Sequence, residues 1–183
     1  MNAIDQLRDE HQTVRTMLAV WRKIVGRMEK GGDVNISDIE RLLGFMKGFV
    51  DHCHHQKEES YLFPALMVLG DRQIDEMVKV FTRDHARFHN LVQDLSRAME
   101  GYKKGDERAK QKMLEALKDY IAVLSNHEAK ETNVLFEIAE NNLPEEVQKK
   151  MEKDFERVGL EHFGAGTPNQ FHNMLEHLQQ IYC

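Results

Sequence analysis

The stretch HHQKEESYLFP, residues 54–64, has a near copy in HEAKETNVLFE, residues 127–137. Each stretch carries a glutamate four residues after its first histidine, Glu58 in one and Glu131 in the other. Residues four apart lie on one face of a helix, so each pair can direct an imidazole and a carboxylate at the same point. A Leu-Phe pair follows each glutamate at the same distance. Two copies with matching flanks predict that each stretch provides half of one metal site.

The sequence around these two stretches is typical of long amphipathic helices. Apolar residues recur at helical spacing, and the segments are separated by glycine- or aspartate-bearing turns. The expected helices run from about 3 to 29, from Ser37 to near Gly70, from Asp71 to Gly101 or Gly105, and from about 107 to 140. No stretch shows the alternation of a strand. Long helices joined by short turns predict an all-α protein, an up-down-up-down four-helix bundle.

The last part of the sequence is predicted to be an appendage of this bundle. We expect residues 1–140 to form the bundle and residues 141–183 to form a C-terminal helical extension packed on it. One helix is expected to begin at Pro144 and another at Thr167-Pro168, because proline is favoured in the first turn of a helix. The first of these is expected to end at about Val158, where the glycine-bearing stretch GLEHFGAG begins. The apolar residues expected to contact one end of the bundle are Phe163, Phe171, Leu175 and Leu178.

Composition limits the classes of partner. The chain of 183 residues has a formal charge of −6 and no basic stripe, which argues against nucleic-acid binding. It has neither a signal-peptide pattern nor an apolar run long enough for a membrane span, so we expect no membrane contact and a cytoplasmic location. Two cysteines without a CxxC fit a reducing compartment and not a zinc–thiolate site. Small molecules and metal ions are the expected partners.

The first and third helices carry further histidines. His85 and His89 lie four residues apart, so both can face one metal ion. His11 precedes His85 by 74 residues, nearly the 73 that relate the two glutamates, which indicates a duplicated helical hairpin. The residue that matches His89 is then Arg15, which is not a metal ligand. We therefore expect the two halves of the site to differ.

This difference predicts two unequal metal positions bridged by Glu58 and Glu131. The expected sets are His85, His89 and His127 on the first metal, and His11 and His54 on the second. The second metal keeps an open position, as catalytic metals do and structural ones do not. Imidazole and carboxylate donors without thiolate suit iron or manganese, and they also allow zinc or copper.

These histidines and glutamates together resemble the hemerythrin-like, or HHE cation-binding, family over residues 5 to 140. The resemblance implies a non-haem di-iron centre with two carboxylate bridges and an oxo or hydroxo bridge, able to bind dioxygen or a related small molecule. The ligands that it implies are His11, His54, Glu58, His85, His89, His127 and Glu131. Oxygen-carrying members have an aspartate five residues after the last histidine, whereas Glu131 follows His127 by four. This sequence looks closer to the prokaryotic members that are not oxygen carriers.

Several residues allow other interpretations. His55 with Glu59 is a second possible HxxxE pair, but only the pair of His54 and Glu58 matches the later copy. His52 and His55 are therefore expected at the surface or beside the ligands. A metal-free bundle would bury costly unpaired charge. A ferritin-like di-iron site would need Glu-x-x-His pairs, which this sequence lacks. The histidines of the appendage, His162, His172 and His177, are expected to face solvent or to cap a helix. For His162, which lies among glycines, an approach to the bundle is the alternative.

The sequence leaves four functions open. The first is binding or sensing of dioxygen, nitric oxide or peroxide at the open iron. The second is a di-iron peroxidase or other oxidoreductase with Tyr61 or Tyr120 as a redox-active neighbour, served by an unidentified redox partner. The third, iron delivery or iron–sulfur repair, is known for relatives with an extra cysteine-bearing N-terminal domain, and this sequence begins at its first expected helix. The fourth is a purely structural metal site.

Overall fold

The computed structural model describes residues 2–163 and 167–183, and within them it contains helices and turns but no strand. Helix α1 (Ala3–Glu29) begins at a capping box, in which the Asn2 side chain accepts a hydrogen bond from the Asp5 backbone and the Asp5 carboxylate accepts one from the Asn2 backbone. It is followed by a turn at Gly31, whose φ of 74° is accessible to glycine without strain. The predicted all-α class is confirmed for these residues.

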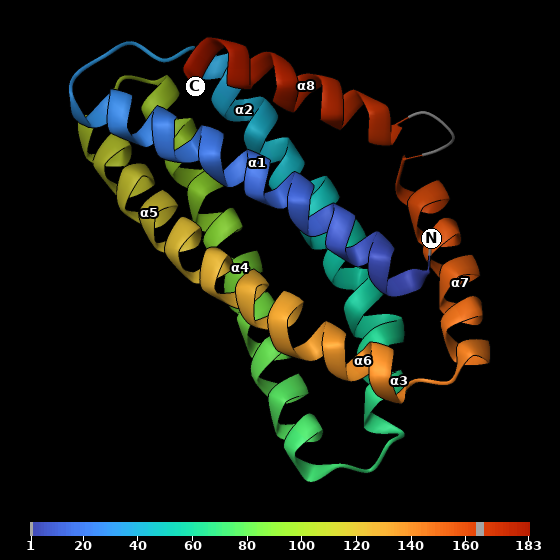
Figure 1. Ribbon diagram of the computed structural model, residues 1–183. Helices are drawn as coiled ribbons and strands as arrows, with labels where there is room; N and C mark the ends of the chain where they lie inside the picture. The colour runs from blue at the N-terminus through green and yellow to red at the C-terminus, as the bar shows by residue number, and fades with distance from the viewer. Residues whose placement is uncertain (1, 164–166) are drawn as a thin grey trace.

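Helix α1 is the first of four rods, by which we mean a single long helix or a run of consecutive helices without an intervening loop. Three further rods complete the main body. The second comprises α2 (Ile36–Phe45), the π-helices η1 (Met46–His55) and η2 (Glu58–Leu62), and α3 (Phe63–Met67). The third is α4 (Arg72–Lys103), and the fourth comprises α5 (Glu107–Lys130), the π-helix η3 (Glu131–Leu135) and α6 (Phe136–Asn142). In Figure 1, α1 lies beside α5 and α5 lies beside α4. The up-down-up-down order of the four rods stays a prediction.

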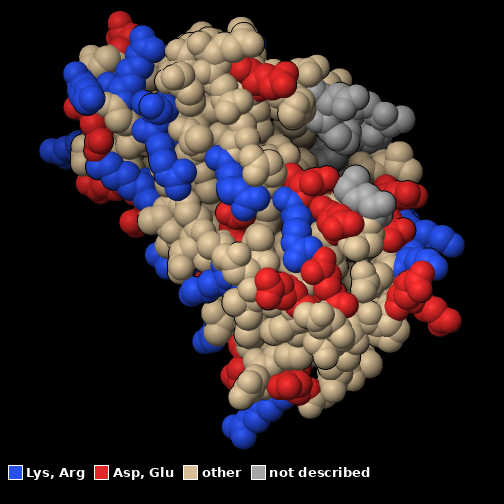
Figure 2. Space-filling view, viewed as in Figure 1, with Lys and Arg blue, Asp and Glu red and all other residues tan. Residues whose placement is uncertain are grey.

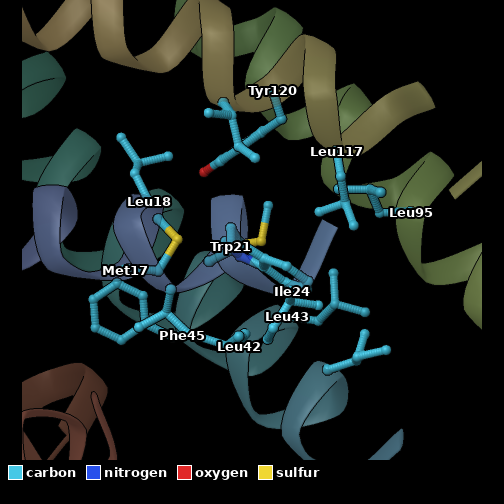
Figure 3. Close-up of a cluster of buried hydrophobic side chains, with 14 of the residues drawn as sticks. Met17, Leu18, Trp21, Ile24, Leu42, Leu43, Phe45, Leu95, Leu117 and Tyr120 are labelled. Atoms are coloured by element: carbon cyan, nitrogen blue, oxygen red, sulfur yellow. The ribbon is translucent and has the colours of Figure 1, made fainter. Parts of the chain in front are cut away.

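Two apolar clusters fill the interior, one toward each end of the rods. On α1 the first cluster ends at Leu7 and the second begins at Val14. On α4 the corresponding residues are Phe81 and Phe88. Figure 3 shows the second cluster, in which Trp21 lies among side chains from the neighbouring rods. The gap between the clusters on each rod falls at the histidines and glutamates, so the interior consists of a polar layer between two apolar ones.

The C-terminal helices α7 (Glu145–Phe163) and α8 (Thr167–Tyr182) lie against the rods (Figure 1). Leu175 and Leu178 of α8 are buried in the cluster that contains Trp21, and Phe171 packs at its edge. These contacts run along α1, as Figure 1 shows, and are not confined to one end of the rods. Helix α7 continues to Phe163, beyond the glycine at 159 where we expected it to break. The side chain of Phe163, which was expected to contact the bundle, lies outside the described part of the structure.

Charges of both signs are spread over the visible surface. Figure 2 shows lysine and arginine side chains gathered toward the upper left, with aspartate and glutamate among them. Among the described helices, none is both long and apolar enough to cross a membrane. The expectation that the chain does not bind nucleic acid stays a prediction.

Candidate metal centre

The polar layer contains two groups of four side chains whose donor atoms lie within 4.8 Å of one another. All of the side chains are buried, and Glu58 belongs to both groups. One group comprises His11, His54, Glu58 and Glu131, and the other comprises His55, Glu58, His85 and His127. The layer therefore brings together six of the seven side chains expected from the sequence. The exception is His89, and His55 is added.

Four imidazoles form two pairs that meet through their Nε2 atoms. The Nε2 atoms of His11 and His54 are 3.0 Å apart, and those of His85 and His127 are 3.1 Å apart. Two nitrogens bound at right angles to one ion, each about 2.1 Å from it, would lie about 3.0 Å apart. The spacing within each pair therefore fits two ligands of a shared metal ion.

The outward nitrogens of the same imidazoles contact oxygens that fix the rings. The Nδ1 contacts are His11 with Thr132 Oγ1 at 2.7 Å, His54 with Glu10 Oε2 at 3.0 Å, His85 with Glu59 Oε1 at 2.8 Å and His127 with Asp84 Oδ2 at 3.3 Å. A proton on Nδ1 that is donated outward leaves the Nε2 lone pair facing inward. This arrangement is the usual one for histidines that bind metals.

The two glutamates lie between the imidazole pairs. Glu58 Oε1 is 3.6 Å from His54 Nε2, whereas its Oε2 is 3.4 Å from His85 Nε2. Glu131 Oε2 is 3.4 Å from His11 Nε2 and 3.2 Å from His127 Nε2. Each carboxylate thus faces nitrogens of both pairs, so Glu58 and Glu131 could each contribute donors to both groups.

The unsatisfied atoms of the layer test whether a metal fits there. Both carboxylate oxygens of Glu58 and of Glu131, and Nε2 of His55, are buried without a hydrogen-bond partner among the described residues. Leaving such groups unpaired in the interior costs about 1–3 kcal/mol each and more when they are charged. Cations held in the two groups of donors would satisfy these five atoms, so the residues fit a metal centre.

The electrostatics of the glutamates fit the same conclusion. Burial, together with repulsion from Glu131, raises the pKa of Glu58 well above its usual range. Burial acts in the same direction on Glu131, but His127 and His11 outweigh it and hold the pKa of that carboxyl well below its usual range. Two carboxylates in one buried layer repel each other unless positive charge lies between them.

The metal-free protein is expected to lose stability in acid. Burial lowers the pKa of His85 to about 3 and that of His55 well below the usual 6.5. From pH 6.5 down to 4.5, both side chains are neutral in the folded chain and become protonated on unfolding. Glu58 offsets one of these protons, because its raised pKa keeps a proton on the folded chain that the unfolded chain has released. Burial also lowers the pKa of His11 and raises that of Asp51 to about 6, and these two shifts oppose each other in the proton balance.

The net uptake of about one proton on unfolding lowers the free energy of unfolding by about 1.4 kcal/mol per pH unit as the pH falls over this range. Urea denaturation of metal-stripped protein at a series of pH values measures this slope. A free energy of unfolding that stays constant or rises toward pH 4.5 would contradict the assignment of neutral, buried imidazoles.

His89 lies outside the layer, and the expectation that it joins His85 is not met. Its side chain is 52% exposed, and its Nδ1 lies 3.5 Å from Asp51 Oδ2. The buried positions of α4 advance alternately by three and four residues, which selects Phe88 and Val92 after His85. His89 falls just outside this stripe, so a helical spacing of four did not suffice to bring it inside.

His55 takes the place that was predicted for His89. It lies at the end of η1, where backbone hydrogen bonds reach five residues back and the turn is wider than in an α-helix. The wider turn brings both His54 and His55 into the interior, although an α-helix would have separated their faces. The His55 ring stacks on His85 with a centroid distance of 3.9 Å. The division into three imidazoles and two is therefore kept with a different third member.

The other half of the layer has an ion pair in the corresponding place. Glu128 follows His55 by 73 residues, as Arg15 precedes His89 by 74. Glu128 is buried, contacts His11 Nδ1 at 3.6 Å and forms an ion pair with Arg15. The break in the repeat at Arg15 thus has a structural counterpart, a glutamate held by arginine where the first half has an imidazole.

The outward partners of the histidines were missed in the sequence. Glu10 and Asp84 each directly precede a histidine of the layer, and Glu59 and Thr132 each directly follow one of its glutamates. Their positions repeat at 74 and 73 residues, so the duplication itself carried the signal. Behind Glu10 lies a buried lysine, Lys57, which binds its other oxygen.

The remaining candidates lie away from the layer. Tyr61 accepts a hydrogen bond from Arg157 on α7, at 3.0 Å. Tyr120 is fully buried in the apolar cluster of Figure 3, and the centroid of its ring lies 5.7 Å from that of Phe88. Cys53 is buried, and burial raises its thiol pKa to about 11, which suits packing and not thiolate ligation.

Comparison with known proteins agrees with this geometry. The model of the hemerythrin HHE cation-binding domain matches residues 2–139, which contain every side chain of the layer. The chain belongs to the hemerythrin HHE cation-binding family. The family is one of cation-binding domains, and the HHE domain of this chain contains two buried clusters that could hold metal ions. The two findings therefore agree.

Curated relatives of this HHE domain include uncharacterised proteins of Mycobacterium bovis and Mycobacterium tuberculosis. Each is 24% identical over 136 residues, which is 74% of this chain and 52% of the relative. The chain therefore spans about half the length of the curated relatives it matches. No solved structure matches the chain.

Removing an oxygen that contacts the outward nitrogen of a histidine in the layer should lower the affinity of the HHE domain for metal. Asp84→Asn removes the carboxylate that orients His127 and should weaken metal binding about 10- to 100-fold, because outer partners hold the ring and its tautomer. Competition with a chelator of known affinity measures the change. Glu76→Gln, an exposed glutamate of the same helix paired with Lys79, is the matched control and should bind metal as the wild type does. Equal affinity in all three proteins would contradict an orienting role.

Proposed function

We propose that this protein is a non-haem di-iron protein that binds or senses dioxygen, nitric oxide or peroxide at an open iron position. The observation that carries the proposal is the unequal division of donors in the layer. His55, His85 and His127 face one metal position, whereas His11 and His54 face the other, and two glutamates lie between them. Such a division leaves one metal with a position free for an exogenous ligand.

The residues around the second position support this choice. Where the first half has His55, the second half has Glu128, and Arg15 holds that carboxylate away from the Nε2 atoms of the layer. Imidazole and carboxylate donors without a thiolate suit iron. The iron pair would supply the redox chemistry, and the chain's own residues hold and orient the imidazoles.

Optical titration of the iron-loaded protein tests the proposal. Protein with two ferrous ions should develop a new absorption band on exposure to dioxygen, nitric oxide or peroxide. One adduct per pair of irons that is lost on removing the ligand indicates binding. Consumption of many equivalents of peroxide with a reductant would instead establish a peroxidase. No response to any of these ligands would rule out both functions and leave a structural site.

A double substitution tests the open position itself. Arg15→His with Glu128→His gives the second half the same pair of residues that the first half has in His89 and His55. A fifth donor at the second metal should abolish or slow adduct formation, while the iron content stays at two. Arg15→Lys is the matched control, because it keeps a cation beside Glu128 and adds no ligand. An unchanged spectral response in the double variant would show that ligands bind elsewhere.

A further inference from the structure

A cavity of about 370 Å³ leads toward the three-imidazole half of the layer. Two of the residues that line it, His55 and His85, are buried members of the layer. Other lining residues lie at the surface, including His52 and His89. The cavity therefore extends from solvent to two candidate ligands, and His89, which the layer does not use, lies at its outer part.

Asp51 connects the inner and outer imidazoles of this cavity. Its side chain is only 7% exposed, and its Oδ1 has no hydrogen-bond partner among the described residues. Oδ1 lies 3.5 Å from Nδ1 of His55, and Oδ2 lies 3.5 Å from Nδ1 of His89. A carboxylate that has left water without a full set of hydrogen bonds is costly. A cation that stays partly hydrated would satisfy it.

The other lining groups also favour a cation. Glu59 adds a second carboxylate, and none of the residues that line the cavity is a lysine or an arginine. Carboxylate and imidazole are the donors that divalent first-row metals share. In the other half of the layer, Arg15 occupies the position that corresponds to His89 and forms its ion pair with Glu128. A guanidinium there repels an approaching cation, so the two halves differ in access as well as in ligands.

We propose that Asp51, His89 and His52 form an outer cation site through which a divalent metal ion enters the buried layer. The ion first exchanges part of its water for Asp51 and an outer imidazole, and then passes to His55 and His85. The proposal rests on the proposed function only in requiring that the layer takes up metal ions. It does not depend on what the loaded metals bind.

Stopped-flow uptake of Co²⁺ by metal-stripped protein tests this route, since binding to buried imidazoles gives Co²⁺ a visible spectrum. His89→Asn and Asp51→Asn should slow uptake at least tenfold. His89→Asn should also leave the final number of bound ions unchanged, because His89 is not part of the layer. His172→Asn is the matched control. Its histidine is also exposed and paired with a carboxylate, Glu176 at 3.1 Å, but it lies outside the cavity.

A steric block provides a second variant that does not touch the donors. Ala86 is an exposed lining residue of α4, so Ala86→Phe should obstruct the cavity and slow Co²⁺ uptake without changing the final spectrum. The control is Gln12→Phe, which introduces phenylalanine at the exposed position 74 residues earlier, in the half that contains Arg15. This variant should leave the rate of Co²⁺ uptake unchanged.

The outcomes separate this route from the proposed function. Wild-type uptake rates in both His89→Asn and Ala86→Phe would overturn the route alone. Normal uptake that is slowed by these variants, with no response of the iron protein to dioxygen, nitric oxide or peroxide, would overturn the function alone. Failure of the wild type to bind Co²⁺ or iron would overturn both.

Discussion

We expect Glu58→Gln to abolish metal binding and to leave the helical fold intact. The side chain is fully buried, and its two oxygens face imidazoles of opposite halves, His54 and His85. A neutral amide of the same shape fits the space but supplies neither the charge nor the second oxygen donor of a bridge. Elemental analysis of the purified variant should therefore find no bound metal above background, while far-ultraviolet circular dichroism matches the wild type.

The same substitution should not weaken the metal-free protein. Burial and Glu131 raise the pKa of Glu58, so the wild-type side chain is destabilising in the absence of a cation. Removing it should stabilise the metal-free fold by about 1 kcal/mol, which raises the melting temperature by about 3 °C in a chain of this size. Differential scanning calorimetry of the metal-stripped proteins measures this difference.

Glu128→Gln is the matched control for this experiment. Glu128 is also a buried glutamate, but it contacts Arg15 and Nδ1 of His11 and not the Nε2 atoms. This control should keep both metal ions. Full metal content in Glu58→Gln, or a metal-free variant less stable than the metal-free wild type, would show that Glu58 is a structural residue and not a bridge.

We expect His55→Leu to lower the number of bound metal ions from two, one for each group of donors, to one. His55 supplies the third imidazole of one group, and its Nε2 has no other partner among the described residues. Leucine keeps the volume that stacks on His85 and Phe88 but has no donor. Metal content and the Co²⁺ spectrum should therefore report the loss of the three-imidazole position, with the other position still occupied.

His89→Leu separates the two possible third ligands. His89 is half exposed and lies outside both groups, so its replacement should leave two ions bound once uptake is complete. The reverse result, with two ions in His55→Leu and one in His89→Leu, would restore the ligand set expected from the sequence. It would also mean that α4 rotates when metal binds.

Much of the candidate site was predictable because it is carried by a repeat. The spacing of four between His54 and Glu58 recurs in His127 and Glu131, and the structure places all four side chains in one layer. His11 followed from the same repeat. The bounds of α1 were predictable as well, since the capping residues and the glycine turn that set them are local in sequence.

The spacing of residues in the sequence could not show which histidines of two closely spaced pairs face the interior. His54 and His55 both enter the interior, and of His85 and His89 only the first does. The expectation that failed rested on uniform α-helical rotation, which η1 does not follow. It also rested on the spacing of four between His85 and His89 alone. The buried residue that follows His85 on α4 is Phe88, three positions later, and His89 is not buried.

The sequence by itself determined the all-α class and the pairing of a histidine with a glutamate in each half of the polar layer, because short-range hydrogen bonding and a repeat of residue types express these directly. Only the tertiary structure decided which imidazoles complete the layer and which oxygens fix them. The direction of a side chain depends on the local pitch of its helix and on the neighbouring rod. His55 faces His85, and Glu10 reaches His54, through contacts between residues that are far apart in the sequence.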